Sequence, residues 1–239
     1  MLNKTKLYIL PMKYVCNANC SWCLSKQNIK SLVKEKMVLD DSFMSNFINS
    51  LNYLKTLPIT KLEFTGGGEP FLNEYLGEII SLLNNHFPSA YKKLYTNGFI
   101  LKPVSHIDEI NISRSHWDSS INQKIYKSPL QNDLRRTTQW FKQYVTKVRT
   151  CTVLQKGAID SPEKIREMIA KLPEVDEFIF RPMNIEARIP DQYIDFDFTH
   201  AKAKKDIIDC TCHKSLVLAP DGKLYFDFNL KEEITLPLK

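Results

Sequence analysis

Long apolar runs are missing from this 239-residue chain, and so are internal repeats, low-complexity tracts and a block of like charges. The apolar run near the N-terminus, residues 7–12, is interrupted by Pro11 and is far shorter than the roughly 20 residues of a membrane-spanning helix. The sequence therefore predicts neither a signal peptide nor a membrane anchor. Cysteine occurs six times. Without a secretion signal, this number favours a cytoplasmic protein whose thiols bind metals or stay reduced.

The formal net charge is +6, with 33 Lys and Arg against 27 Asp and Glu, which favours an anionic partner. Because the lysines are spread along the chain, their simplest interpretation is a solvated surface. We expect a peptide or small-molecule substrate, no membrane partner, and no nucleic acid as the main partner. The 43% of hydrophobic residues is typical of a globular protein, and the length is enough for one well-packed domain, or for one domain plus a small appendage.

Three cysteines gather in one short polar loop, Cys16-Asn17-Ala18-Asn19-Cys20-Ser21-Trp22-Cys23, directly after the first predicted strand. Thiolates are soft ligands for iron–sulfur clusters or zinc, and so short a loop can place three sulfurs around one inorganic centre. A structural zinc site normally uses four protein ligands, whereas three sulfurs leave one iron of a four-iron cluster open. The predicted metal ligands are therefore Cys16, Cys20 and Cys23, and the alternative is three unrelated buried thiols.

Strand-like and helix-like segments alternate along most of the chain. The predicted strands are residues 6–12, 60–65, 93–96, 109–114, 147–154 and 177–181. Predicted helices begin at Asp40, at Leu72 and at Ser161, with further helical sequence before Tyr144. This order is typical of a parallel α/β domain, in which the loops at the carboxyl ends of the strands collect on one rim. The cysteine loop, the triple glycine at residues 66–68, Asn97-Gly98 and Ser113-Arg114 all fall on that rim. Their convergence predicts one active site there.

Glycine occurs only seven times, yet three glycines stand together at Gly66, Gly67 and Gly68, before Glu69. Such a cluster predicts positive φ angles or a backbone that comes very close to a ligand. A tight turn without any ligand is the alternative interpretation.

The cysteine spacing, with Trp22 before the third cysteine, and the Gly67-Gly68-Glu69 motif resemble the signature of the radical S-adenosylmethionine (radical SAM) superfamily. The resemblance covers about residues 6–185 and implies a partial (β/α)6 TIM-like barrel. It implies a [4Fe-4S] cluster on the three cysteines, S-adenosylmethionine on the open iron, and an electron donor such as flavodoxin or ferredoxin. It also implies reductive cleavage to a 5′-deoxyadenosyl radical, which abstracts hydrogen from a peptide or small polar metabolite. A glycyl-radical enzyme activase and a non-catalytic iron–sulfur or zinc module stay open as alternatives.

The resemblance further implies roles for individual side chains, although none is assigned to the catalytic step. Cofactor-binding roles fall to Trp22, Gly67, Gly68, Glu69, Ser113 and Arg114. The guanidinium of Arg114 could make a bidentate contact with a carboxylate of the cofactor. The alternative for residues 113–118 is a solvated loop without a ligand. Arg181 is expected either to reach the cofactor or an acidic substrate, or to form a salt bridge at the rim. Cys151, where relatives often have asparagine, is expected inside the barrel.

The alternation stops at about residue 189, and residues 214–229 predict a β-hairpin around Pro220-Asp221-Gly222. We therefore divide the chain into a core at residues 1–188 and a C-terminal extension at residues 189–239. With Cys210 and Cys212, the extension resembles a truncated form of the SPASM or twitch domains that hold auxiliary clusters. Because no cysteine follows Cys212, we predict a single cluster, with both thiols reduced.

Overall fold

The computed structural model describes residues 5–23, 25, 34–129, 132–183, 189–206, 215–228 and 230–235. Its main element is a nine-stranded sheet in the order β11-β10-β1-β4-β5-β6-β7-β8-β9, parallel except where β10 meets β11. The strands are β1 (Lys6–Ile9), β4 (Lys61–Phe64), β5 (Tyr91–Thr96), β6 (Glu109–Ser113), β7 (Lys147–Val153), β8 (Glu177–Arg181), β9 (Ala203–Lys205), β10 (Leu216–Leu218) and β11 (Leu224–Tyr225). A separate antiparallel pair consists of β2 (Met12–Lys13) and β3 (Glu35–Lys36).

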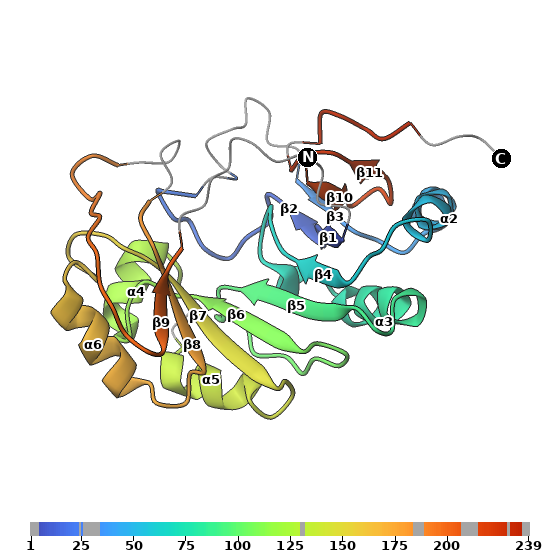
Figure 1. Ribbon diagram of the computed structural model, residues 1–239. Helices are drawn as coiled ribbons and strands as arrows, with labels where there is room; N and C mark the ends of the chain where they lie inside the picture. The colour runs from blue at the N-terminus through green and yellow to red at the C-terminus, as the bar shows by residue number, and fades with distance from the viewer. Residues whose placement is uncertain are drawn as a thin grey trace.

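Helices connect the parallel strands and lie around the outer side of the curved sheet (Figure 1). They are α2 (Asp41–Leu54), the short 3-10 helix η1 (Pro70–Leu72), α3 (Leu76–His86), α4 (Ser119–Tyr126), α5 (Leu134–Phe141) and α6 (Pro162–Lys171). Four of these α-helices begin at a side chain that accepts a hydrogen bond from a first-turn N–H, namely Asp40, Asp118, Asp133 and Ser161. Among the described residues, none of the helices has the length and hydropathy to cross a membrane.

Successive strand residues face opposite sides of the sheet. Leu62 and Phe64 of β4, like Ile110 and Ile112 of β6, are fully buried in the core shared with the helices. The residues between them face the inner side and are mostly polar or charged. One row across five strands consists of Tyr8, Glu63, Lys93, Glu109 and Lys147. The apolar outer face therefore holds the helices, and the polar inner face is left for chemistry.

The predicted α/β fold with a partial barrel is confirmed, because the sheet curves and, over the described ranges, no pairing joins β9 to β11. Two predicted boundaries are wrong. The strand predicted at residues 6–12 ends at Ile9, because Pro11 lacks an N–H and separates β1 from β2. The helix predicted from Leu72 begins at Leu76, because Glu69 first caps the short turn Pro70–Leu72.

The chain after residue 188 contributes to both edges of the sheet. Strand β9 pairs with β8, β10 pairs with β1, and β10 and β11 form the predicted hairpin. The sequence did not predict β9, which is too short and too exposed to show a hydrophobic period. After the hairpin, the Phe228 ring packs edge-on against Tyr8, with centroids 4.8 Å apart. Cys210 and Cys212 lie outside the described residues, and the division at residue 188 stays a prediction.

Candidate active site at the carboxyl rim

The cysteine loop follows β2 and is held against the glycine turn after β4 by two backbone hydrogen bonds. The Tyr14 N–H donates to the Gly67 carbonyl over 2.5 Å, and the Glu69 N–H donates to the Val15 carbonyl over 2.9 Å. Tyr14 has a φ of 61°, a left-handed conformation that turns the chain into the loop. The start of the loop is thereby fixed to the rim of the sheet.

The other side of the loop packs on an aromatic cluster at the end of α4. The Asn19 N–H donates to the Tyr126 carbonyl over 2.7 Å, and Ala18, Phe99 and Tyr126 are buried together. The Trp22 ring meets the Tyr126 ring edge-on, with centroids 5.8 Å apart. The Trp22 Nε1 is buried and has no hydrogen-bond partner among the residues that the structure describes. A buried, unpaired donor at this point fits a residue that contacts a cofactor.

The three cysteines predicted as metal ligands lie in this loop, with Cys16 exposed and Cys20 and Cys23 half-buried. Two N–H groups face the Cys16 sulfur: the Ala18 backbone at 3.4 Å and Asn97 Nδ2 at 3.8 Å. In the part of the chain that the structure describes, no three Cys, His, Asp or Glu side chains are placed to hold a single metal ion. Three thiols of one short loop are a donor set that a four-iron cluster can use, because each cysteine binds its own iron.

Glycine is required in this turn by the backbone angles of the turn and by the backbone atoms that lie against it. Gly66 and Gly67 have positive φ angles of 77° and 68°. A Cβ on Gly67 would lie 2.5 Å from the Met12 carbonyl oxygen, and one on Gly68 would lie 2.2 Å from the Val15 carbonyl oxygen. The close approach predicted from the sequence is thus an approach to the first residues of the cysteine loop. The roles of Gly67 and Gly68 in cofactor binding stay predictions.

Glu69 is buried beneath this turn, with 1% of its surface exposed. Its carboxylate accepts hydrogen bonds from the Thr96 hydroxyl at 2.7 Å, the Asn97 N–H at 2.7 Å and the Phe71 N–H at 3.2 Å. Burial raises the pKa of Glu69, and these donors together with the nearby Arg114 oppose that rise. The carboxylate therefore joins the glycine turn to the end of β5, and its predicted contact with a cofactor stays a prediction.

Arg114, directly after β6, is completely buried. Its Nε donates to the Asn97 carbonyl over 2.7 Å, and its guanidinium carbon lies 3.9 Å from the centre of the Phe99 ring. Within the described ranges, neither Nη1 nor Nη2 has a hydrogen-bond partner. Burial lowers the pKa of Arg114 to about 10, so the side chain is still a cation at neutral pH. Two unpaired donors on a buried cation fit the predicted contact with a carboxylate, which stays a prediction.

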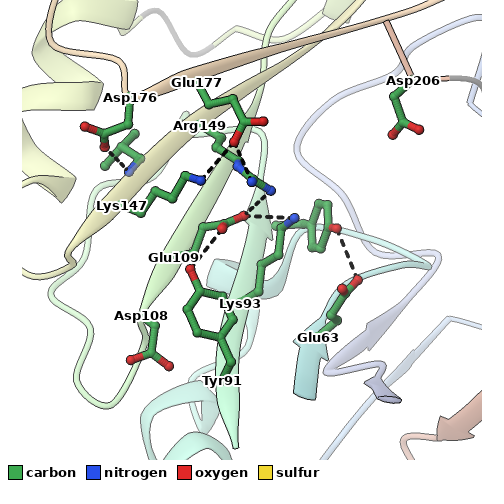
Figure 2. Close-up of polar contacts among 12 residues, drawn as sticks. Glu63, Tyr91, Lys93, Asp108, Glu109, Lys147, Arg149, Asp176, Glu177 and Asp206 are labelled. Atoms are coloured by element: carbon green, nitrogen blue, oxygen red, sulfur yellow. Dashed lines mark hydrogen bonds and ion pairs between the residues drawn. The ribbon is translucent and has the colours of Figure 1, made fainter. Parts of the chain in front are cut away.

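Charged side chains form a connected network on the inner face, below the rim (Figure 2). Glu109 pairs with Lys93 at 2.9 Å and with Arg149 at 3.0 Å, and Arg149 also pairs with Glu177 at 2.5 Å. Burial alone would raise the pKa of Glu177, but the basic neighbours, Lys204 first among them, lower it to about 2. Together with the Lys204–Glu177 ion pair, these contacts connect β5 to β9.

On the inner face, Asn111 and Arg149 each have a buried polar atom without a hydrogen-bond partner in the described part of the chain. Asn111 is 1% exposed and lies in register between Tyr95 and Arg149. Its Oδ1 is buried without a hydrogen bond, and so is the Nε of Arg149. Next to them, the half-buried Ser113 is in register with Cys151, which is buried as predicted. Burial raises the pKa of the Cys151 thiol, so this thiol is protonated at neutral pH.

Arg181, at the carboxyl end of β8, forms a salt bridge with Asp206, which directly follows β9. Its Nε and Nη2 donate to the same Asp206 oxygen over 3.0 and 2.6 Å. Of the two roles left open for Arg181 by the sequence, the salt bridge is confirmed. Sequence reasoning missed Asp206, because the segment around it shows neither a motif nor a hydrophobic period.

Comparison with known proteins gives distant relatives, and no family model matches the chain. The chain is 25% identical over 222 residues, 85% of its length, to a Helicobacter pylori protein named GTP 3′,8-cyclase. It is 24% identical over 176 residues, 70% of its length, to a second Helicobacter pylori protein named UPF0026 protein. The chain spans only 61% of the length of the first relative and 56% of the second.

Solved structures of similar shape also match most of the chain. The native anSMEcpe with bound AdoMet covers 97% of it, with a TM-score of 0.60 and 16% identity, over 77% of that chain. A radical SAM methyltransferase from Sphaerobacter thermophilus covers 84%, with a TM-score of 0.56 and 13% identity, over 65% of that chain. This chain has the fold of radical SAM enzymes. Streptococcus suis SuiB bound to the precursor peptide SuiA covers 75%, with a TM-score of 0.56 and 16% identity, over 39% of that chain.

Proposed function

We propose that this chain is a radical SAM enzyme. The observation that carries the proposal is the three-cysteine loop, which is clamped onto the carboxyl rim of an open α/β sheet with that fold. Cys16, Cys20 and Cys23 would hold the cluster. When bound, a [4Fe-4S] cluster with S-adenosylmethionine supplies a 5′-deoxyadenosyl radical that abstracts hydrogen from the substrate.

The rim residues would bind and orient the cofactor. Trp22 Nε1 and the two Nη groups of Arg114 are buried donors without partners, which supports contacts with acceptor groups of the bound cofactor. Ser113 lies at the end of the same strand as Arg114. Gly67 and Gly68 would contribute through their backbone, and Glu69 by fixing that backbone, since its carboxylate already accepts three hydrogen bonds.

The inner face of the sheet would bind the substrate, which we propose is a peptide or a small polar metabolite. An unpaired buried polar group costs about 1–3 kcal/mol, and such groups on Asn111 and Arg149 are explained by a polar ligand. The net charge of +6 favours a substrate with a carboxylate or phosphate group. One relative is named for GTP and one structural neighbour binds a precursor peptide, so both substrate classes occur among similar proteins.

The chain's own residues also shape the environment of the reaction. The core on the outer face keeps the strand ends rigid, which helps to hold a substrate hydrogen close to the reacting centre. An external electron donor such as flavodoxin or ferredoxin and a reducing cytoplasm belong to the same proposal, because the cluster must be reduced before each turnover.

Anaerobic reconstitution with iron and sulfide tests the proposal. The wild type is expected to hold about four irons per chain. The electron paramagnetic resonance (EPR) spectrum of its reduced cluster should change when S-adenosylmethionine is added. Cys20→Ala should lose the cluster, whereas Cys151→Ala, which removes a thiol outside the loop, should keep it. A cluster that does not respond to S-adenosylmethionine would favour a non-catalytic module, and a full cluster in Cys20→Ala would contradict the ligand assignment.

A further inference from the structure

Asn97 lies between the two buried charges of the rim. It follows β5 directly and is 7% exposed. Its N–H donates to the Glu69 carboxylate over 2.7 Å, and its carbonyl accepts from Arg114 Nε over 2.7 Å. Hydrogen bonds to ionised groups are roughly twice as strong as neutral ones. The backbone of Asn97 is therefore held from both sides, and moving it would leave two buried charges less well paired.

The Asn97 side chain contacts the cysteine loop. Its Oδ1 accepts from the Phe99 N–H over 3.0 Å, which closes the turn at Gly98. Its Nδ2 donates to Asn17 Oδ1 over 2.6 Å and to Cys16 Sγ over 3.8 Å. An amide nitrogen carries two hydrogens, and in this arrangement the cysteine loop takes both. The turn itself needs only the Oδ1 and the backbone, so the Nδ2 contacts call for a second explanation.

We propose that Asn97 is a positioning residue for the cluster: it fixes Cys16 against the rim and donates a hydrogen bond to the Cys16 sulfur. The inference rests on the proposed function, since it takes Cys16 as a cluster ligand. Hydrogen bonds to the sulfurs are one of the factors that set the reduction potential of an iron–sulfur cluster. A donor at Cys16 stabilises negative charge on the sulfur and therefore favours the reduced cluster. Without this donor the cluster is harder to reduce.

Asn97→Asp and Asn97→Ala separate the hydrogen bond from the charge. Asn97→Asp keeps the size of the side chain and the acceptor for Phe99, but it loses both donors and adds a negative charge. Asn97→Ala loses the donors without adding a charge. Asn132→Asp is the matched control, because the Asn132 Nδ2 donates to the Phe99 carbonyl of the same turn over 2.7 Å, and not to the cysteine loop.

The rate of iron loss and the midpoint potential of the cluster, both measured on reconstituted protein, test this role of Asn97. Neither measurement needs a substrate. Both Asn97 variants should lose cluster iron to a chelator about tenfold faster than the wild type, as expected for one hydrogen bond to a charged group. Their midpoint potentials, from EPR-monitored titration without S-adenosylmethionine, should shift to more negative values. Asn132→Asp should keep the wild-type potential. The Tm of the cluster-free proteins shows whether a substitution has disrupted the turn at Gly98. An unchanged Tm together with a shifted potential assigns the effect to the contact with the Cys16 sulfur.

Three outcomes would overturn the inference. In the first outcome, the wild type holds its cluster and both Asn97 variants have the same midpoint potential and iron retention as the wild type. Asn97 then has no positioning role, and the proposed function still stands. An equal potential shift in Asn132→Asp would assign the effect to the turn and contradict a direct sulfur contact. A wild type that binds no iron would overturn the proposed function, and this inference with it.

Discussion

Replacing Gly68 by alanine tests whether the glycine turn is built to receive the cysteine loop. The added Cβ would lie 2.2 Å from the Val15 carbonyl oxygen and 3.0 Å from the Val15 carbonyl carbon. Backbone atoms cannot rotate away as a side-chain end can, so the first residues of the loop must shift. Overpacking of this kind costs about 1–3 kcal/mol, which for a chain of this size lowers Tm by about 2–12 °C.

Gly77→Ala is the matched control, because a Cβ at Gly77 meets nothing within 4 Å in the first turn of α3. That substitution should leave the stability equal or raise it by about 0.4–1 kcal/mol, since alanine restricts the unfolded chain. Urea unfolding of both cluster-free variants gives the free energies, and iron analysis after reconstitution gives the effect on the loop. We expect Gly68→Ala to lose stability and iron together. Equal stabilities of the two variants would refute the packing argument.

Three further predictions concern other parts of the site. Asn111→Leu should raise the stability of the cluster-free protein by about 1–3 kcal/mol in urea unfolding, because it removes a buried amide oxygen that has no partner among the described residues; a loss of stability would show that the amide is structural. The ion pairs of Glu177 lower its pKa to about 2, so their stabilisation is present above the ordinary value of about 4.5 and fades as the pH falls toward 2. The Tm difference between wild type and Glu177→Gln should thus be constant above about pH 5 and shrink below it, and a difference that grows in acid would contradict this assignment. Wild type and the Cys210→Ala, Cys212→Ala double variant should both hold about four irons, whereas about eight falling to four would reveal an auxiliary cluster.

The position of the site could be predicted from the sequence, because it depends on regular features. Alternating strands and helices place the ends of parallel strands on one rim, and the cysteine loop and Gly67 follow two of these ends. Local capping chemistry also gave two helix starts, at Asp40 and at Ser161. The fold class followed from these local patterns alone.

The contacts inside the site could not be predicted, because they join residues far apart in the chain. The neighbour of Gly68 is Val15, more than 50 residues away, and nothing near Gly68 in the sequence indicates this. The side chain of Asn97 reads as a turn residue until its contact with Cys16 is seen. Likewise, the partner of Arg181 lies in a segment without any periodic pattern.

The most direct test of the central claim is the amount of 5′-deoxyadenosine formed after reduction of the reconstituted protein in the presence of S-adenosylmethionine. Mass spectrometry of anaerobic mixtures gives this amount for the wild type and for Cys16→Ala, Cys20→Ala and Cys23→Ala. The wild type is expected to form 5′-deoxyadenosine, and the three variants are expected to form none above the protein-free background. A wild type with a full cluster and no 5′-deoxyadenosine, or a variant as active as the wild type, would contradict the proposed function.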